Sequence, residues 1–399
     1  MLDCANLELD YANAGAAYFR AQRYNLAIDA FTKAIEMQPN SANLYNDLGL
    51  SYFYQKDFDE AEKAFLNAIK ENSNFFKAYN NLAWLYYYKQ ENETAKDYFS
   101  NALKIAPDSE EVINSYGEFH FNINEFDEAL DFFLKLTSIN ENNPDTYFKI
   151  AKCYIEKDLY SDAITFLEKA IAIDDKIPEY YQELGRIYYK KTEMEKAKIT
   201  FEKLLTIEPT NEWAYSNLGN IYFYFYEDLD VAYEYYKKSY ELNPDYCWAS
   251  YNLANLKIIY KNYDEALFLY EQAVELAPQN PLFINGLART YQKLNETDTA
   301  IEFFQKVLEL DNENEEASIA LAEIYLKDKQ DFVIAKNYFE KTKNINPKNS
   351  LAYYGLAKLY FFDFDKNNAM MNIEIALKLN NDNDKFKALR NQIRELKDE

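Results

Sequence analysis

The side chains that most often perform catalysis or bind metals are scarce in this chain. Its 399 residues contain one histidine, His120, and three cysteines, Cys4, Cys153 and Cys247, none of which forms a CxxC pair. A zinc site needs several such ligands close together, and nucleophilic catalysis needs a base beside the nucleophile. The sequence therefore predicts no metal site and no catalytic residues, and we expect the chain not to be an enzyme.

Cofactor and nucleic-acid binding are also disfavoured. No two of the seven glycines lie within ten residues of each other, whereas a loop that cradles phosphate needs clustered glycines. The 67 acidic and 43 basic residues give a formal net charge of −24, which repels polyanions. We therefore expect no cofactor, no small-molecule substrate and no nucleic-acid partner.

The first residues, MLDCANLELD, lack the basic and apolar segments of a secretory signal, and no apolar run is long enough to span a membrane. These features predict a cytoplasmic protein without membrane insertion. The oligomeric state cannot be inferred from the sequence.

A period of 34 residues organises the remaining residues. Segments 27–40, 61–74 and 95–108 align with one another, and the same step continues through most of the chain. Two of the steps contain one extra residue, which we place in turns near Asp228 and Lys329. The eleven resulting units are 8–41, 42–75, 76–109, 110–143, 144–177, 178–211, 212–246, 247–280, 281–314, 315–349 and 350–383.

Each unit has the same internal pattern. Position 8 is always glycine or alanine, position 20 is always alanine, position 11 is tyrosine in nine units, and position 24 is large and apolar, from Phe31 to Ile373. Proline occurs only at positions 1 and 32, where helices begin and end. We expect positions 8, 11, 20 and 24 to form the core, with His120 at position 11 as a core histidine, and we interpret Cys153 and Cys247 as structural thiols.

This pattern resembles the tetratricopeptide repeat family over residues 8–383. The resemblance implies an all-α fold, a right-handed superhelical alpha-solenoid of tandem helix-turn-helix repeats, in which the first helix of each repeat lines a concave groove. It also implies a protein or peptide partner. Residues 1–7 would form an N-terminal lead-in. Residues 384–399 would form a C-terminal capping helix, since Phe386, Leu389, Ile393 and Leu396 make one apolar stripe.

If the groove is lined by positions 2, 5, 6, 9, 12 and 13, all three tryptophans face it. Trp84 stands at position 9, and Trp213 and Trp248 stand at position 2 of adjacent repeats. Tryptophan is enriched at binding hot spots because it offers a large rigid surface. The alternative is that these side chains only pack against a neighbouring helix.

Asparagine recurs on the same face. Asn13, Asn81, Asn217 and Asn252 stand at position 6, and the segments YSNLGN and YNLAN add Asn220 and Asn255. An amide can donate to and accept from a peptide backbone, and the family resemblance implies this use. The series is interrupted at position 6 by Ser115, Lys149, Glu183, Gly286, Ala320 and Gly355, and the chain is rich in asparagine throughout, so chance is the alternative.

Basic groove residues form a third candidate group. Lys149, Lys152 and Arg186 belong to repeats five and six, and Arg289 and Lys293 belong to repeat nine. They could bind acidic side chains of a partner, or nearby glutamates could neutralise them. No repeat has lysine at position 5, so the carboxylate clamp of chaperone-binding family members is disfavoured.

We therefore predict a protein-protein interaction scaffold or adaptor that binds a peptide segment or partner protein in the concave groove. The alternative is a structural subunit of a larger assembly that uses the edges or the convex face of the solenoid. An RNA-binding helical repeat is disfavoured by the acidic charge.

Overall fold

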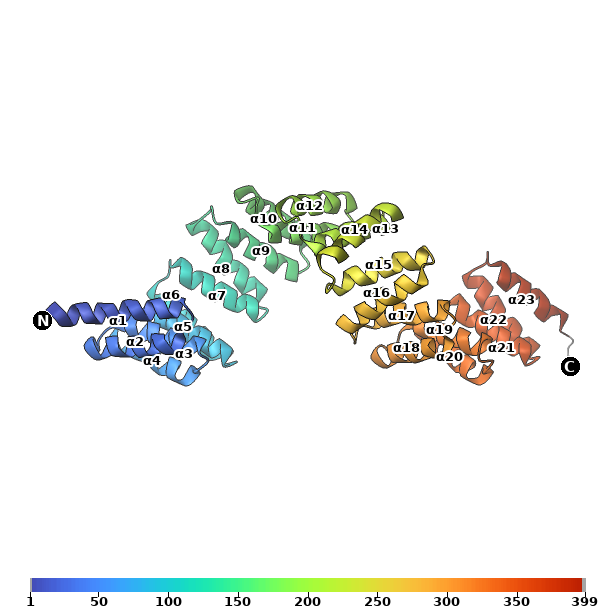
Figure 1. The fold of residues 1–399 in the computed structure, drawn as a ribbon, viewed down its shortest axis with the longest axis horizontal. Coiled ribbons are helices and arrows are strands. Elements are labelled where there is room, and N and C mark those ends of the chain that lie inside the picture. The colour runs from blue at the N-terminus through green and yellow to red at the C-terminus, as the bar shows by residue number, and fades with distance from the viewer. Residues whose placement is uncertain (1, 397–399) are drawn as a thin grey trace. The chain divides into compact units, whose positions relative to one another are not determined.

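The computed structural model describes the backbone of residues 2–396 and side chains from residue 9 onward. Over these residues the chain is an all-α helical repeat solenoid of 23 helices without a strand (Figure 1).

The first twelve helices are α1 (Leu2–Arg20), α2 (Tyr24–Met37), α3 (Ala42–Tyr54), α4 (Phe58–Glu71), α5 (Phe76–Tyr88), α6 (Asn92–Ile105), α7 (Glu110–Asn122), α8 (Phe126–Ile139), α9 (Pro144–Glu156), α10 (Tyr160–Ile173), α11 (Pro178–Lys190) and α12 (Met194–Ile207). The others are α13 (Glu212–Tyr224), α14 (Leu229–Leu242), α15 (Cys247–Ile259), α16 (Tyr263–Leu276), α17 (Pro281–Lys293), α18 (Thr297–Leu310), α19 (Glu315–Lys327), α20 (Phe332–Ile345), α21 (Ser350–Phe362), α22 (Lys366–Leu379) and α23 (Asp384–Glu395).

Asparagine has a structural role at the start of many helices. The side-chain oxygens of seven asparagines accept hydrogen bonds from backbone N–H groups of the helices that they precede: Asn143, Asn211, Asn262, Asn280, Asn314, Asn349 and Asn383. Such caps satisfy N–H groups that have no partner within the helix. Part of the high asparagine content is therefore explained by helix capping rather than by binding.

The turn inside each helix pair contains one residue in the left-handed conformation. In the first pair this residue is Gln22, with a φ of 57°. The N–H of Arg23 donates to the carbonyl of Tyr18 (2.9 Å) and that of Gln22 to Phe19 (2.9 Å), which is the Schellman arrangement that ends a helix. The extra residues near Asp228 and Lys329 lie in these turns, as predicted, because the turns at 225–228 and 328–331 are each one residue longer than the turn at 55–57.

Small residues and rings interlock in the core. The alanines at position 20 are all fully buried, from Ala27 to Ala369. At Gly49, an added Cβ would lie 2.6 Å from the ring of Phe65, which belongs to the second helix of the same pair. Position 8 is therefore small because a position-24 side chain packs directly against the helix backbone.

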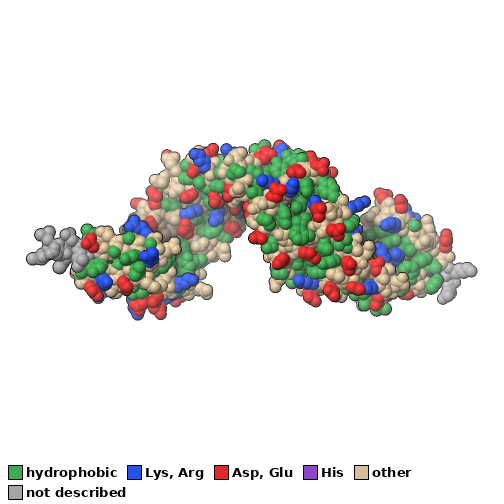
Figure 2. Space-filling view, in the orientation of Figure 1, with side chains coloured by type: hydrophobic (Ala, Val, Ile, Leu, Met, Phe, Trp, Pro, Cys, Tyr) green, Lys and Arg blue, Asp and Glu red, His purple; other side chains and the backbone are tan. Residues whose placement is uncertain are grey.

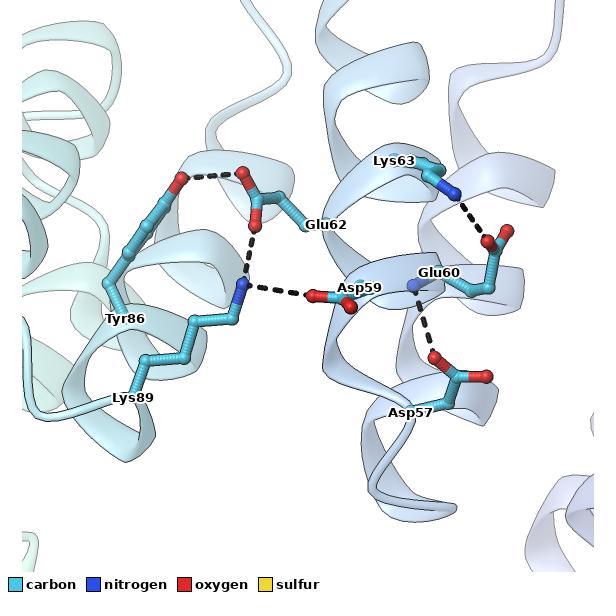
Figure 3. A network of polar contacts seen from close by, with 7 residues as sticks. All are labelled: Asp57, Asp59, Glu60, Glu62, Lys63, Tyr86 and Lys89. Carbon is cyan, nitrogen blue, oxygen red and sulfur yellow. Dashed lines mark hydrogen bonds and ion pairs between the residues drawn. The ribbon is translucent and has the colours of Figure 1, made fainter.

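The tyrosines at position 11 differ from the prediction, since most are only half-buried and Tyr18 is 36% exposed. Their phenol groups reach polar partners. The hydroxyl of Tyr86 donates to Glu62 (2.7 Å), whose second oxygen accepts from Lys89 (2.6 Å), and this joins α4 to α5 (Figure 3). Tyrosine is suitable here because its ring covers the core while its hydroxyl stays at the surface.

His120, in contrast, is buried as predicted. Its Nδ1 lies 2.7 Å from an oxygen of Glu125, and its ring stacks on Phe132 with 5.5 Å between centroids. Cys153 is buried and free, and Cys247 is half-buried and free. The side chain of Cys4 lies outside the described ones.

The structures of the two ends of the chain agree to different degrees with the predictions from the sequence. At the N-terminus α1 starts at Leu2, so residues 2–7 of the predicted lead-in are helical and continuous with the first helix of repeat one. At the C-terminus α23 packs on α22 and α21, and Phe386, Leu389 and Ile393 join one buried cluster with Ile373 and Leu377. The predicted apolar stripe thus lies against the last repeat.

The chain divides into two compact units, Met1–Ile187 and Tyr188–Glu399. Each has its own buried clusters, for example around Phe133 in the first unit and around Phe304 in the second. The repeat period continues through the division, so the sequence contains no sign of it.

Candidate protein-binding surface

The largest of the described cavities in the first unit lies along the first helices of repeats two to four. It has a volume of about 480 Å³, and we call it the Trp84 cavity. Its lining is mostly aromatic: Leu50, Phe53, Tyr54, Phe65, Asn81, Trp84, Tyr87, Tyr88, Glu118 and Asn122. Such a cavity combines apolar surface with a few polar groups, which is typical of binding sites for other molecules.

Trp84 forms a rigid wall of this cavity. Its ring is half-buried and meets Tyr87 edge to face at 5.5 Å and Phe99 at 5.6 Å. Tyr88 is 58% exposed and contacts Phe53, with 5.3 Å between ring centroids. The packing alternative thus holds for one side of Trp84, while the side that lines the cavity remains available to a partner.

Asn81 lines the same cavity, but part of its amide is already engaged. Its Nδ2 donates to Oδ1 of Asn46 at 2.8 Å, which joins α5 to α3. Asn13 is exposed on α1 and does not line this cavity. The structure therefore brings Asn81 and Trp84 together and leaves Asn13 apart.

The second unit contains a cavity of about 380 Å³, which we call the Asn255 cavity. Its lining combines aromatic, aliphatic and charged side chains: Phe223, Tyr224, Tyr251, Asn255, Ile258, Ile259, Tyr270, Leu282, Asn285, Gly286, Arg289, Lys293 and Glu316. Asn255 accepts a hydrogen bond from the Tyr270 hydroxyl at 2.6 Å. Burial raises the pKa of Tyr270, so this hydroxyl stays protonated and donates.

Asn285, which the sequence reasoning did not single out, has a distinctive position in the Asn255 cavity. It is 5% exposed, and its Nδ2 donates to Glu316 at 2.7 Å, while its Oδ1 is buried without a hydrogen-bond partner. Arg289 lies 3.4 Å from the same carboxylate. One glutamate of repeat ten therefore orders two polar side chains of repeat nine.

The other predicted asparagines are engaged inside the second unit. Asn217 donates to the carbonyl of Trp213 on its own helix (2.8 Å), Asn220 accepts from Tyr236 (2.8 Å), and Asn252 donates to Ser216 (3.0 Å). Asn252 is also buried. These amides hold helices and core tyrosines in place, and they do not form a continuous row of unpaired groups.

Trp213 and Trp248 differ in exposure. Trp213 is half-buried and packs edge to face on Phe201 at 5.3 Å. Trp248 is 39% exposed and meets Phe283 at 4.9 Å. Neither lines the Asn255 cavity, so the structure does not bring them together with Asn255.

The basic residues of repeats five and six fall into two groups. Lys149 and Lys152 line one cavity of about 230 Å³ with Glu118 and Phe121. Lys149 donates to Glu118 at 2.6 Å, whereas Lys152 lies over the ring of Phe121 at 5.2 Å.

Arg186 does not line that cavity and instead pairs with Glu183 of its own helix at 2.5 Å. Neutralisation by glutamate, the alternative considered from the sequence, thus applies to Lys149 and Arg186.

A fourth cavity, which the sequence reasoning missed, lies at the C-terminal end of the second unit. It has a volume of about 320 Å³, and we call it the lysine cavity after Lys327, Lys358 and Lys385. Two of these lysines stand at groove positions 13 and 9 of repeats ten and eleven, but the third belongs to the cap. The groove positions of Lys327 and Lys358 in neighbouring repeats could have indicated a basic site from the sequence. The contribution of Lys385 could not be predicted in this way, because the cap lies outside the repeat pattern.

No group of three or more His, Cys, Asp and Glu side chains among those described is placed to hold a metal ion. None of the described helices is both long and apolar enough to cross a membrane. Figure 2 shows acidic, basic and apolar side chains interspersed over the visible face.

Family models described as tetratricopeptide repeat match most of the sequence. The matched residues are 13–75, 76–109, 144–177, 178–211, 214–246, 257–303 and 295–359. A comparison with curated proteins finds no match.

Among solved structures, the APC/C hetero-tetramer Cut9–Hcn1 is similar, with a TM-score of 0.51 and 16% identity over 97% of this chain and 87% of that chain. Yeast Tom70 has a TM-score of 0.42 and 17% identity over 98% of this chain and 95% of that chain. The protein YrrB, described as having an unusual peptide-binding site, has a TM-score of 0.40 and 20% identity over 48% of this chain and 97% of that chain. At 16% identity the similarity to Cut9–Hcn1 shows the fold alone.

Proposed function

Because the chain belongs to the tetratricopeptide repeat family, we propose that it is a non-catalytic interaction scaffold that binds a peptide segment of a partner protein on the first helices of its repeats. The observation that carries this proposal is the Trp84 cavity. Aromatic side chains line it, and Asn81, Glu118 and Asn122 supply polar groups. We expect a large apolar side chain of the partner to enter the cavity and its backbone to pair with these groups.

The energetics favour Trp84 as the main contributor. A hydrogen bond to an amide such as Asn81 contributes only about 0.5–1.5 kcal/mol. Truncation of an aromatic residue at the centre of an interface commonly costs about 2 kcal/mol or more. Binding should therefore depend more on Trp84 than on Asn81.

The test is site-specific photo-crosslinking from position 88 at the edge of the Trp84 cavity, in lysate of the source cell, with the crosslinked partner peptide identified by mass spectrometry. We expect Trp84→Ala to abolish the crosslink. Since Trp84 also packs on Phe99, Asn81→Ala and Tyr54→Ala serve as variants that leave this packing intact and should weaken the crosslink.

Phe268→Ala is the matched control, because this side chain is 61% exposed on α16, a second helix of a pair. A crosslink that is equal in the Trp84, Asn81 and Tyr54 variants would refute the assignment of this cavity.

A second candidate function, a structural subunit of an assembly, is favoured by one apolar patch in the second unit. Phe332 and Phe362 stack with 5.5 Å between centroids at the turns of the last two repeats. Val333 is 73% exposed and Phe364 is 74% exposed. If this patch joins copies of the chain, light scattering across concentrations should show association that Phe364→Ser with Val333→Ser removes, and a strict monomer would exclude that use.

A further inference from the structure

The lysine cavity has a cationic lining in a strongly acidic protein. It is bounded by Glu323, Leu326 and Lys327 of α19, Phe339 of α20, Leu351, Tyr354, Gly355 and Lys358 of α21, and Asn383, Lys385 and Phe386 at the start of the cap helix. Three lysines thus face one glutamate. The formal charge of the whole chain is −24, so this is a local reversal of sign.

An ion pair neutralises one of the three lysines. Lys327 pairs with Glu323 at 3.1 Å on the same helix. Among the residues that the structure describes, neither Lys358 nor Lys385 has an ion-pair partner. Lys358 instead lies 5.9 Å from the ring centroids of Tyr354 and Phe362. Ring faces attract a cation only weakly, so a carboxylate would be a better partner.

Burial lowers the pKa of Lys358, the neighbouring charge of Lys327 lowers it further, and the charge of Glu323 opposes this without reversing it. The charged form of Lys358 is therefore disfavoured relative to that of a solvated lysine. An anion in the cavity would stabilise the charged form of Lys358. Its binding there should therefore be more favourable than its binding to a solvated surface lysine.

At Gly355 the ring of Phe339 packs directly against the helix backbone, and both residues line the cavity. An added Cβ at this position would lie 2.2 Å from the ring of Phe339, so the position cannot carry the side chain that other repeats have there. Tyr354 stacks on Phe386 of the cap at 4.7 Å, which fixes the opposite wall. The cavity is therefore formed jointly by the last repeat and the cap helix.

The N-terminus of the cap helix is not itself the site. The side chain of Asn383 accepts hydrogen bonds from the N–H groups of Lys385 (3.0 Å) and Phe386 (3.4 Å). These N–H groups are already satisfied, so the lysine side chains remain as the donors for a ligand.

We propose that the lysine cavity binds a carboxylate of an acidic peptide segment through Lys358, Lys327 and Lys385. This inference rests on the proposed function in so far as the occupant belongs to a protein partner. The carboxylate comes from an aspartate or glutamate side chain or from a chain terminus, and both sources present the same group. Acidic peptides are favoured over other occupants because the tyrosine and leucine side chains of the walls contact the peptide while the lysines pair with its charge.

The experiment uses the full chain with its lysines dimethylated by ¹³C-formaldehyde, which keeps their charge, and follows each dimethyl-lysine signal by NMR. The probe is N-acetylated triglutamate, either with a free C-terminus or amidated, and N-acetylated triglutamine amide is the neutral comparison. Lysine-to-glutamine variants identify the signals.

We expect the signals of Lys358, Lys327 and Lys385 to shift and saturate with triglutamate. Binding of the amidated peptide as well would assign the carboxylate to a side chain, and binding of the free peptide alone would assign it to a terminus. Lys358→Gln should weaken binding at least about tenfold, since a charge-assisted hydrogen bond is lost, and Lys358→Arg should restore most of it. Lys378→Gln is the control, because Lys378 is exposed on α22 outside the cavity.

The inference is overturned if the Lys358 signal shifts no more than that of Lys378, or if triglutamine amide shifts it equally. It is also overturned if inorganic phosphate at the same concentration binds as well as both peptides, since the cavity would then select charge alone. Because the Trp84 crosslink lies in the other unit, either result leaves the test of the proposed function independent.

Discussion

The cap helix should be held to the solenoid mainly by one ring. Phe386 is 1% exposed, stacks on Tyr354 and belongs to the cluster that includes Ile373 and Leu377. The helix that carries it packs mainly on α22 and, to a lesser extent, on α21. A helix of this length is marginal alone in water, so its stability must come from this packing.

Phe386→Ala should therefore release the cap without unfolding the rest of the second unit. Truncation of a buried phenylalanine costs about 3–5 kcal/mol. Because each 1.36 kcal/mol is a factor of ten, opening of α23 should become at least about a hundredfold more frequent. In a repeat array each unit contacts mainly its neighbours, so we expect the effect to fade within one repeat.

Hydrogen–deuterium exchange with mass spectrometry measures this directly. Protection should fall in α23 and partly in α22, and stay unchanged in α13 to α16. Phe268→Ala is the matched control, since this ring is 61% exposed on α16, outside the cap cluster and the apolar patch, and it should leave the protection of α23 unchanged. Equal loss of protection across α13 to α23, or none in α23, would refute the reasoning.

Three further predictions concern other contacts. Burial raises the pKa of Glu62, but hydrogen bonds from Lys89 and Tyr86 outweigh it and lower the pKa, so the stabilisation exists above the unfolded pKa and is lost as pH falls through the folded one. Glu62→Gln should reduce stability at pH 7 by under about 1 kcal/mol, and the difference should vanish in acid, as measured by urea unfolding at several pH values. Gly286→Asn should destabilise by about 1–3 kcal/mol in the same assay, because a Cβ there would lie 2.4 Å from the ring of Tyr270. Burial raises the pKa of the Cys153 thiol to about 12, so iodoacetamide at pH 8 should label it only in urea, as read by peptide mass spectrometry.

Each of these three predictions has an experimental result that would contradict it. A Glu62→Gln difference that is equal at pH 3 and pH 7 would show that the ionised carboxylate is not the source of the effect. A stable Gly286→Asn variant would mean that the ring of Tyr270 moves aside easily. Rapid labelling of native Cys153 would show that repeats four and five, whose side chains bury it, open far more often than a buried core allows.

The repetitive part of this fold could be predicted closely from the sequence. From α3 onward, the first helix of each pair begins at the residue where the period restarts, as at Ala42 and Ser350. This accuracy has a physical cause, since the small residue at position 8, the alanine at position 20 and the large apolar side chain at position 24 must meet in every repeat. The period also places the two longer turns, because an extra residue can be tolerated only outside the helices.

The candidate site could be predicted less well, because its chemistry depends on contacts between neighbouring repeats. The position of Asn81 on the first helix follows from the period, but its pairing with Asn46 depends on what the preceding repeat carries at position 5. Likewise, Asn252 looks like a ligand-binding residue in the sequence, yet Ser216 of the preceding repeat binds its amide. A pattern that describes one repeat at a time cannot contain this information.

The glycines at position 6 show why the asparagine series is interrupted. At Gly286 and Gly355 the second helix of the preceding repeat carries a ring, Tyr270 or Phe339, that rests on the backbone and leaves no space for a side chain. In the last repeat Gly355 lines the cavity that also contains Lys358, and the cap supplies Lys385 to the same cavity. Three lysines line this cavity, whereas mostly aromatic side chains line the Trp84 cavity, so ligand preference should differ between the two cavities. Peptides selected separately on Trp84→Ala and Lys358→Gln proteins should accordingly lose different features, an aromatic side chain in the first case and an acidic one in the second.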